Sequence, residues 1–326
     1  MPKSKLKIKS TKAIDRKNIA VLYAGGRAAP FTTKRQYTDW CQSFFEMQMI
    51  AEAAPVLVAG NPKLGQVEHA LAAAKQIEKL WDDFDGFVVS FAPGAFLYDA
   101  NLLEIILGEV GKPVVCTTSP TPGGVSEVGE YSDIGLKANL INAISSAAAD
   151  LVGVGVVMGS MLALASDVII QEEGEVDVYY PRPGATVARI DFGLVMEKDT
   201  KNREITKPNL DLSICSDVYY LNVRINPVAQ DNFVWPPRGA GPQTKGLVID
   251  GGEHLKLSIT KELPEVPVLL LAEQVAYLYR KGQLTEITER TPGEAAALFV
   301  WLLGNDCAEA DLVARLQAEQ PKRIAQ

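Results

Sequence analysis

The residues of this chain best suited to nucleophilic chemistry are four hydroxyl side chains at the ends of two short apolar runs. Ser90 closes the run 85–90, and Thr117, Thr118 and Ser119 close the run that begins at residue 112. Reacting groups of α/β sheets gather at the carboxyl ends of the strands, so a hydroxyl could act there as a nucleophile if a base took its proton. Ser and Thr are also common in turns, where their hydroxyls hydrogen-bond to the backbone, and we favour this second interpretation.

The chain offers few partners for such a nucleophile. Its two histidines are His69, on an amphipathic segment, and His254, in a glycine-rich stretch, and we expect both to be ordinary surface or capping residues. The sequence lacks a Gly-x-Ser-x-Gly elbow, a phosphate loop and a zinc-protease helix. The cysteines have no Cys-x-x-Cys spacing, so we expect reduced, mostly buried thiols at Cys41, Cys116, Cys215 and Cys307. We therefore predict no metal site and no cofactor.

Composition and charge limit the classes of partner. Of the 326 residues, 47% are hydrophobic and 22% are charged. The formal net charge is −8, which disfavours nucleic acid because phosphate binding needs a cationic surface. No apolar run approaches the roughly 18 residues of a membrane-spanning helix, so we expect no membrane partner. Lys and Arg crowd the first 17 residues, and the apolar h-region of a secretion signal does not follow them. We therefore expect a solvated arm, and we expect the protein to be cytoplasmic.

Strand-like and helix-like segments alternate through the first part of the chain. The predicted strands are 18–23, 56–59, 85–90, 112–117 and 152–158, and the predicted helices are 38–54, 66–84, 99–107 and 136–149. This alternation predicts an α/β fold with a doubly wound, mainly parallel sheet. Residues 176–192 alternate like a hairpin, with Pro181 and Pro183 at its turn.

A smaller α/β domain is predicted to follow a polar linker. We place the basic arm at 1–17, the first domain at 18–198, the linker at 199–212 and the second domain at 213–326. Strands of a second sheet are predicted at 213–224, 245–250 and 266–272, and a helix at 291–304. This helix has a clear start, because Thr291 can cap it, Pro292 occupies its first position and Glu294 completes a capping box.

Taken together and in order, these segments resemble the L-asparaginase superfamily, in particular its cytoplasmic type. The first strand ends in Tyr-Ala-Gly-Gly at 23–26, the next buried strand begins Asp-Gly-Phe-Val-Val at 85, and the following strand reads Lys-Pro-Val-Val from 112. Further similar segments are 132–143, 154–158, 166–168, 245–249 and 291–304. The resemblance implies amide hydrolysis through a threonine nucleophile, assisted by a second threonine, an aspartate, a lysine and a loop tyrosine. It also implies a homo-oligomer, either a dimer or a tetramer.

The catalytic positions implied by this resemblance carry other residue types. Arg27 stands directly after the paired glycines, where the family has its nucleophilic threonine. A guanidinium is effectively never deprotonated, so it cannot replace that nucleophile. The lysine position, three residues after Asp167, falls on Ile170. Only Tyr37, in the loop after the first strand, matches the family's tyrosine.

The family's His-Gly-Thr-Asp-Thr loop is also replaced. The corresponding residues here are Phe91, Ala92, Pro93, Gly94 and Ala95, so proline and glycine stand at the second threonine and the aspartate. With Phe96 this loop is apolar, which fits a filled pocket or a protein contact better than hydrolysis.

Two classes of function therefore stay open. One is a pseudoenzyme that binds a small carboxylate or amino acid, or that supports a partner subunit. In it Arg27 either holds the ligand or fills the pocket and pairs with an acid such as Asp133. The other is an active amidohydrolase with a rewired nucleophile, Ser119 or Thr118. The pocket candidates are Gly26, Arg27, Tyr37, Ser90, Phe91, Ala92, Pro93, Gly94, Thr118, Ser119 and Asp133.

Overall fold

The computed structural model of the chain describes most of its length. The described residues are 16–25, 31–58, 67–119, 129–149, 151, 153–173, 176–191, 193–197, 206–224, 243–252, 255, 265–288 and 290–318. For 129–134, 172–173 and 176–178 it describes the backbone alone. Within this part of the chain, no helix combines the length and the apolar character that crossing a membrane requires.

The larger sheet has eight strands in the order β10-β9-β6-β5-β4-β3-β1-β2. The strands β2, β1, β3, β4 and β5 run parallel, while β6, β9 and β10 are antiparallel to their neighbours. Their bounds are β1 Asn18–Ala24, β2 Glu52–Leu57, β3 Gly86–Phe91, β4 Pro113–Thr117, β5 Gly153–Met158, β6 Met161–Leu164, β9 Thr186–Ile190 and β10 Leu194–Met196. The prediction of a large, mainly parallel sheet is confirmed.

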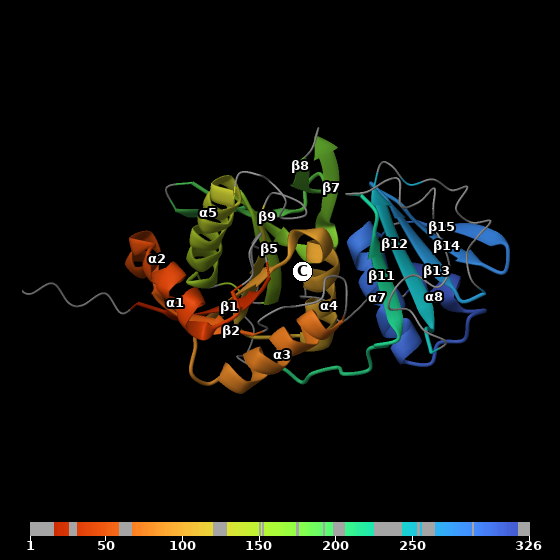
Figure 1. Cartoon of the computed structure of the whole chain (residues 1–326), viewed down its shortest axis with the longest axis horizontal. Helices are drawn as coiled ribbons and strands as arrows, with labels where there is room; N and C mark the ends of the chain where they lie inside the picture. The colour runs from red at the N-terminus through yellow and green to blue at the C-terminus, as the bar shows by residue number, and fades with distance from the viewer. Residues whose placement is uncertain are drawn as a thin grey trace, which may run out of the picture.

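Helices cover both faces of this sheet, as Figure 1 shows. One face carries α1 Lys34–Gln42, α2 Phe45–Ile50 and α5 Gly129–Ala147, and the other carries α3 Glu68–Leu80 and α4 Phe96–Leu107. The alternation along β1 explains this arrangement, because successive side chains of a strand point to opposite faces. Ile19 and Val21 pack in the same core as α1 and α5, whereas Ala20 and Leu22 pack in the same core as α3 and α4.

A separate five-stranded sheet forms the smaller domain, in the order β11-β12-β13-β14-β15. Its first three strands are parallel and its last three antiparallel. The bounds are β11 Val218–Asn222, β12 Gly246–Gly252, β13 Val268–Ala272, β14 Ala276–Arg280, β15 Gln283–Ile287, α7 Pro292–Gly304 and α8 Leu312–Ala318. The predicted Thr291 cap and the place of Pro292 at the start of α7 are confirmed, since the Thr291 hydroxyl accepts from the Glu294 backbone N–H. The Glu294 carboxylate accepts from Arg290 Nη1 at 2.6 Å.

Helix α4 joins the two domains (Figure 1). All of its twelve residues are buried, and it packs against α7 as well as against the larger sheet. Gly293 allows this close approach, because a Cβ there would lie 2.9 Å from Leu97 Cβ, inside any normal contact distance. A short two-stranded ribbon, β7 Val168–Glu173 with β8 Val176–Pro181, lies beside this junction.

Two sequence predictions of the fold are wrong. Residues 38–54 were expected to form one helix, but α1 ends at Gln42, α2 at Ile50, and Glu52 starts strand β2. The helical spacing of apolar residues continues by chance into β2, which tolerates Pro55 because it is an edge strand. Residues 176–192 were expected to form a hairpin, but β8 pairs with β7 and β9 pairs with β6 and β10. The alternation of apolar and polar residues predicts that β8 and β9 are strands, but it does not predict which strands they pair with.

Candidate functional site

The carboxyl ends of β1, β3 and β4 lie side by side at one edge of the larger sheet. Their register places Tyr23 opposite Ser90, and Ser90 opposite Thr117. The predicted hydroxyl residues and the loop after β3 therefore meet here, because parallel strands end at the same edge. Gly26 and Arg27 lie outside the described residues, and of Asp133 only the backbone, in α5, is described.

All four hydroxyl residues at this edge are buried, and three of them donate to backbone carbonyls. Ser90 Oγ donates to Gly25 O at 2.6 Å, Thr117 Oγ1 to Val157 O at 2.9 Å, and Thr118 Oγ1 to Phe91 O at 2.8 Å. Ser119 is 2% exposed. Thr118 is held from its backbone as well, since Asn139 Nδ2 donates to its carbonyl oxygen at 2.8 Å. These hydroxyls fix the loops in the way that turn residues do.

The loop after β3 is held from two sides. Tyr179 on β8 donates its hydroxyl to Pro93 O at 3.2 Å, and Asn222 on β11 donates to Gly94 O at 2.5 Å. Gly25 packs against the same loop with a φ of +137°, and a Cβ there would lie 2.8 Å from Ala92 N. Pro93–Ala95 forms a single 3₁₀ turn, η1, that leads directly into α4. The apolar loop is thus packed between the larger sheet, the β7–β8 ribbon and the smaller domain.

Tyr37 lies in a helix and not in a loop as predicted. It is fully buried on α1, and its hydroxyl donates to Val21 O at 3.2 Å. Its ring packs with Tyr23, Phe31 and Trp40, at centroid distances of 5.2 to 6.2 Å. Burial, and then the neighbouring Cys41, raise the pKa of Tyr37 well above its ordinary value. In this position the phenol is a core residue.

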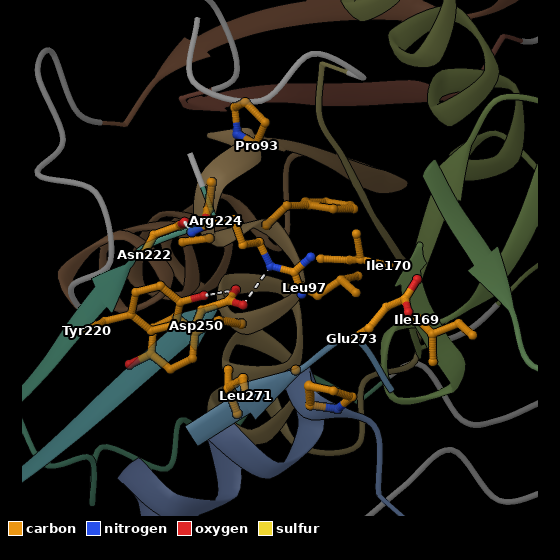
Figure 2. A pocket seen from close by; sticks show the side chains of 16 residues that line it. Pro93, Leu97, Ile169, Ile170, Tyr220, Asn222, Arg224, Asp250, Leu271 and Glu273 are labelled. Carbon is orange, nitrogen blue, oxygen red and sulfur yellow. Dashed lines mark hydrogen bonds and ion pairs between the residues drawn. The ribbon is translucent and has the colours of Figure 1, made fainter. Parts of the chain in front are cut away.

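A cleft opens between the two domains beside the loop after β3 (Figure 2). It holds about 450 Å³ of empty space, part of which is open to solvent. Its apolar walls include Leu97 from α4, Ile170 from β7 and Leu271 from β13. Ile170, which the family resemblance aligns with the catalytic lysine, is one of these apolar residues. The first turn of α4 faces the cleft, and no side chain caps that helix.

The polar part of the cleft comes from the smaller domain. Arg224 Nε donates to Asp250 Oδ1 at 2.6 Å, and the Tyr220 hydroxyl donates to Asp250 Oδ2 at 2.8 Å. The side chains of Arg224 and Asp250 are both 6% exposed. Burial, and then Asp250, raise the pKa of Tyr220 well above its ordinary value. In Figure 2 the Asp250 carboxylate lies between Tyr220 and Arg224, with both interactions drawn as dashed lines, and Glu273 also lines the cleft.

Sequence reasoning missed this polar group. Tyr220 and Arg224 were assigned only to a predicted strand, and Asp250 to the end of another. The sequence did carry one signal, because Arg224 and Asp250 each lie at the carboxyl end of a predicted strand. The structure shows that these strands, β11 and β12, are parallel neighbours. A charge at such a position indicates a ligand site only once the pairing of the strands is known.

The expected surface position of His69 is wrong. His69 is 3% exposed and its Nδ1 lies 3.6 Å from Oδ2 of Asp99, which is fully buried. His254 lies outside the described residues.

The predicted state of the cysteines is confirmed: all four are free, three are buried and Cys307 is partly exposed. Among the described residues, no three His, Cys, Asp or Glu side chains gather as metal ligands would.

Comparison with known proteins identifies the family. The family model "Asparaginase, N-terminal" matches residues 18–198, more than half of the chain. Escherichia coli (strain K12) L-asparaginase 1 is 36% identical over 75 residues, which cover 23% of this chain and 20% of that protein. The matched region is thus about a fifth of the relative's length. The chain belongs to the asparaginase family.

Solved structures of asparaginases share the fold over nearly the whole chain. The thermostable L-asparaginase of Thermococcus kodakarensis has a TM-score of 0.61 at 16% identity and covers 95% of this chain and 99% of its own. A probable cytoplasmic L-asparaginase of Campylobacter jejuni gives 0.61 at 19% identity over 92% of this chain and 99% of its own. At these identities the likeness concerns the fold alone.

Proposed function

We propose that this chain is an asparaginase-like protein that does not hydrolyse L-asparagine and that binds a small carboxylate, in particular an amino acid. The observation that carries the first part is the state of the hydroxyls at the strand ends. Ser90, Thr117 and Thr118 are fully buried, and each donates its proton to a backbone carbonyl. A nucleophilic hydroxyl needs a base that can accept its proton, and a peptide carbonyl is not such a base.

The loop after β3 supports the same conclusion. Phe91, Ala92, Pro93 and Gly94 have no side-chain group that could donate or accept a proton. Tyr179 and Asn222 hold this loop by its carbonyl oxygens. A rewired nucleophile at Thr118 would have to give up its bond to Phe91 O and find a new base. Ser119, the other alternative, is 2% exposed.

The interdomain cleft favours a carboxylate with an amino group. Arg224 brings a guanidinium, which matches the geometry of a carboxylate, and the start of α4 adds the positive end of a helix dipole. Asp250 balances the charge of Arg224, so Glu273 leaves the described cleft with one negative charge in excess. An ammonium group on the ligand would compensate this charge. Arg27 stands at the family's nucleophile position and is the second arginine that we assign to carboxylate binding.

Thermal unfolding with added ligands tests the binding. L-aspartate, L-asparagine and succinate would each be titrated, because succinate has the carboxylates of aspartate without its amine. We expect the amino acids to raise the midpoint of unfolding more than succinate does. Arg27→Ala and Arg224→Lys should abolish or reduce the rise, whereas Arg189→Ala, at a side chain that is 68% exposed, should not. Wild-type protein that none of these ligands stabilises would contradict the binding part of the proposal.

A further inference from the structure

His69 and Asp99 form a buried pair between α3 and α4. His69 is the second residue of α3, and Asp99 is in the first turn of α4. The His69 Nδ1 to Asp99 Oδ2 distance is 3.6 Å, and the side chains are 3% and 0% exposed. Neither nitrogen of His69 and neither oxygen of Asp99 has a hydrogen-bond partner among the described residues. Polar atoms this deeply buried are rarely left unsatisfied. Because 3.6 Å is only slightly longer than a hydrogen bond, we expect a small movement to bring His69 Nδ1 and Asp99 Oδ2 into contact.

Among the described residues, His69 is the one basic side chain that acts directly on the Asp99 carboxyl. The other titratable groups that interact with Asp99 are Tyr98 on α4, Cys116 on β4 and Tyr220 on β11, none of which can carry a positive charge. Arg224 acts on Tyr220, but it is paired with Asp250. His69 is therefore the group that can share a proton with Asp99.

Charge balance then fixes the number of protons. With one proton the pair is neutral overall, either as imidazole and carboxylic acid or as imidazolium and carboxylate. Without that proton it is a lone carboxylate in the core, which is costly. Burial raises the pKa of Asp99 above its ordinary value of 3.8, and the contact with His69 lowers it in part.

We propose that His69 and Asp99 share one proton that holds α3 against α4, and that release of this proton as the pH rises loosens the contact. The sign follows from the raised pKa of Asp99. Its contribution to stability is fully present below 3.8 and is lost as the pH rises through the higher value of the folded state. Phe96, Leu97 and Tyr98, which precede Asp99, line the interdomain cleft. The pair thus makes one wall of the cleft sensitive to pH.

Amide hydrogen exchange of the full chain tests this inference. Rates corrected for intrinsic exchange would be compared between pH 5 and pH 8 for α3 and for the first turn of α4. In the wild type we expect protection to fall as the pH rises. In Asp99→Asn, which has no proton to lose, we expect protection that does not change with pH. The same fall in Asp99→Asn, or no fall in the wild type, would overturn the proposal.

Urea unfolding of the variants adds an independent readout. One proton changes the unfolding equilibrium by at most about tenfold per pH unit. His69→Gln should show a steeper loss of stability with rising pH than the wild type, because its Asp99 ionises without a partner. The double variant His69→Gln/Asp99→Asn should show no such slope. The free energy of unfolding would be plotted against pH for the wild type, both single variants and the double variant. If these four curves ran parallel, His69 and Asp99 would not share a proton.

Nuclear magnetic resonance of the wild type keeps the test valid if a variant does not fold. The chain has only two histidines, so the His69 imidazole signals are easily identified. A proton shared between Nδ1 and the Asp99 carboxyl leaves the His69 ring either as imidazolium or as the Nε2–H tautomer, so at pH 5 we expect one of these two forms. A neutral His69 ring protonated on Nδ1 alone at pH 5 would overturn the proposal.

Discussion

At the scale of single residues, burial decides which groups can react. Cys41 lies in the core beside Tyr37, and burial raises its pKa to about 12, although the hydrogen bond with Tyr37 lowers it in part. Burial also raises the pKa of Cys116 and of Cys215. Only Cys307 is partly exposed. Because the thiolate is the reactive form, the four thiols should differ strongly in their rates of alkylation.

Labelling with iodoacetamide at pH 8 should therefore modify Cys307 alone in the folded protein. We expect Cys41, Cys116 and Cys215 to react more than about a hundredfold more slowly, since they lack both exposure and thiolate. Peptide mass spectrometry identifies the labelled positions, and all four should react in concentrated urea. If Cys41 of the folded protein were labelled as fast as Cys307, its side chain would not be buried as the structure has it.

At the scale of elements, the loop after β3 depends on donors from elsewhere. Tyr179 and Asn222 come from β8 and β11, and neither element is a sequence neighbour of the loop. The Asn222 bond ties the smaller domain to the carboxyl edge of the larger sheet, and the Tyr179 bond ties the β7–β8 ribbon to it.

Asn222→Ala should lower the free energy of unfolding by about 1 kcal/mol, the usual value of one hydrogen bond. It should also speed hydrogen exchange within residues 91–95, because Gly94 O loses its donor. Asn142→Ala is the matched control. Asn142 also donates from its side chain to a backbone carbonyl, that of Gly159 at 2.8 Å, but this bond is exposed and does not involve the loop after β3. Equal exchange within 91–95 in both variants would show that Asn222 does not hold the loop.

Elements with a local signal were predictable from the sequence. β1 and α7 follow from an apolar run and from the Thr-Pro-x-Glu start, which need no tertiary information. The position of His69 was harder to predict, although it shares a helix face with Ala73 and Ile77, four and eight residues later. The pair of Arg224 and Asp250 exists only because β11 and β12 are neighbours. The chemistry of the cleft was therefore not predictable from spacing alone.

At the scale of the whole molecule, the two domains share one hydrophobic core through α4 and α7. The family resemblance also predicts a homodimer or homotetramer. Exposed apolar side chains on α2 and β10 are available for such contacts: Phe45, Met49, Val195 and Met196. Light scattering of the purified protein should give two or four times the mass of one chain. A monomer at all concentrations would exclude this assembly.

We propose that this chain retains an asparaginase fold without asparagine hydrolysis. The most direct test is the ammonia that purified protein releases from L-asparagine and L-glutamine over a day, with Escherichia coli L-asparaginase 1 as the positive control. We expect no more ammonia than from buffer, because the hydroxyls of Ser90, Thr117 and Thr118 are bonded to backbone carbonyls and residues 91–95 have no proton-transfer side chain. Sustained release that Ser119→Ala or Thr118→Ala abolishes would instead establish an active amidohydrolase with a rewired nucleophile.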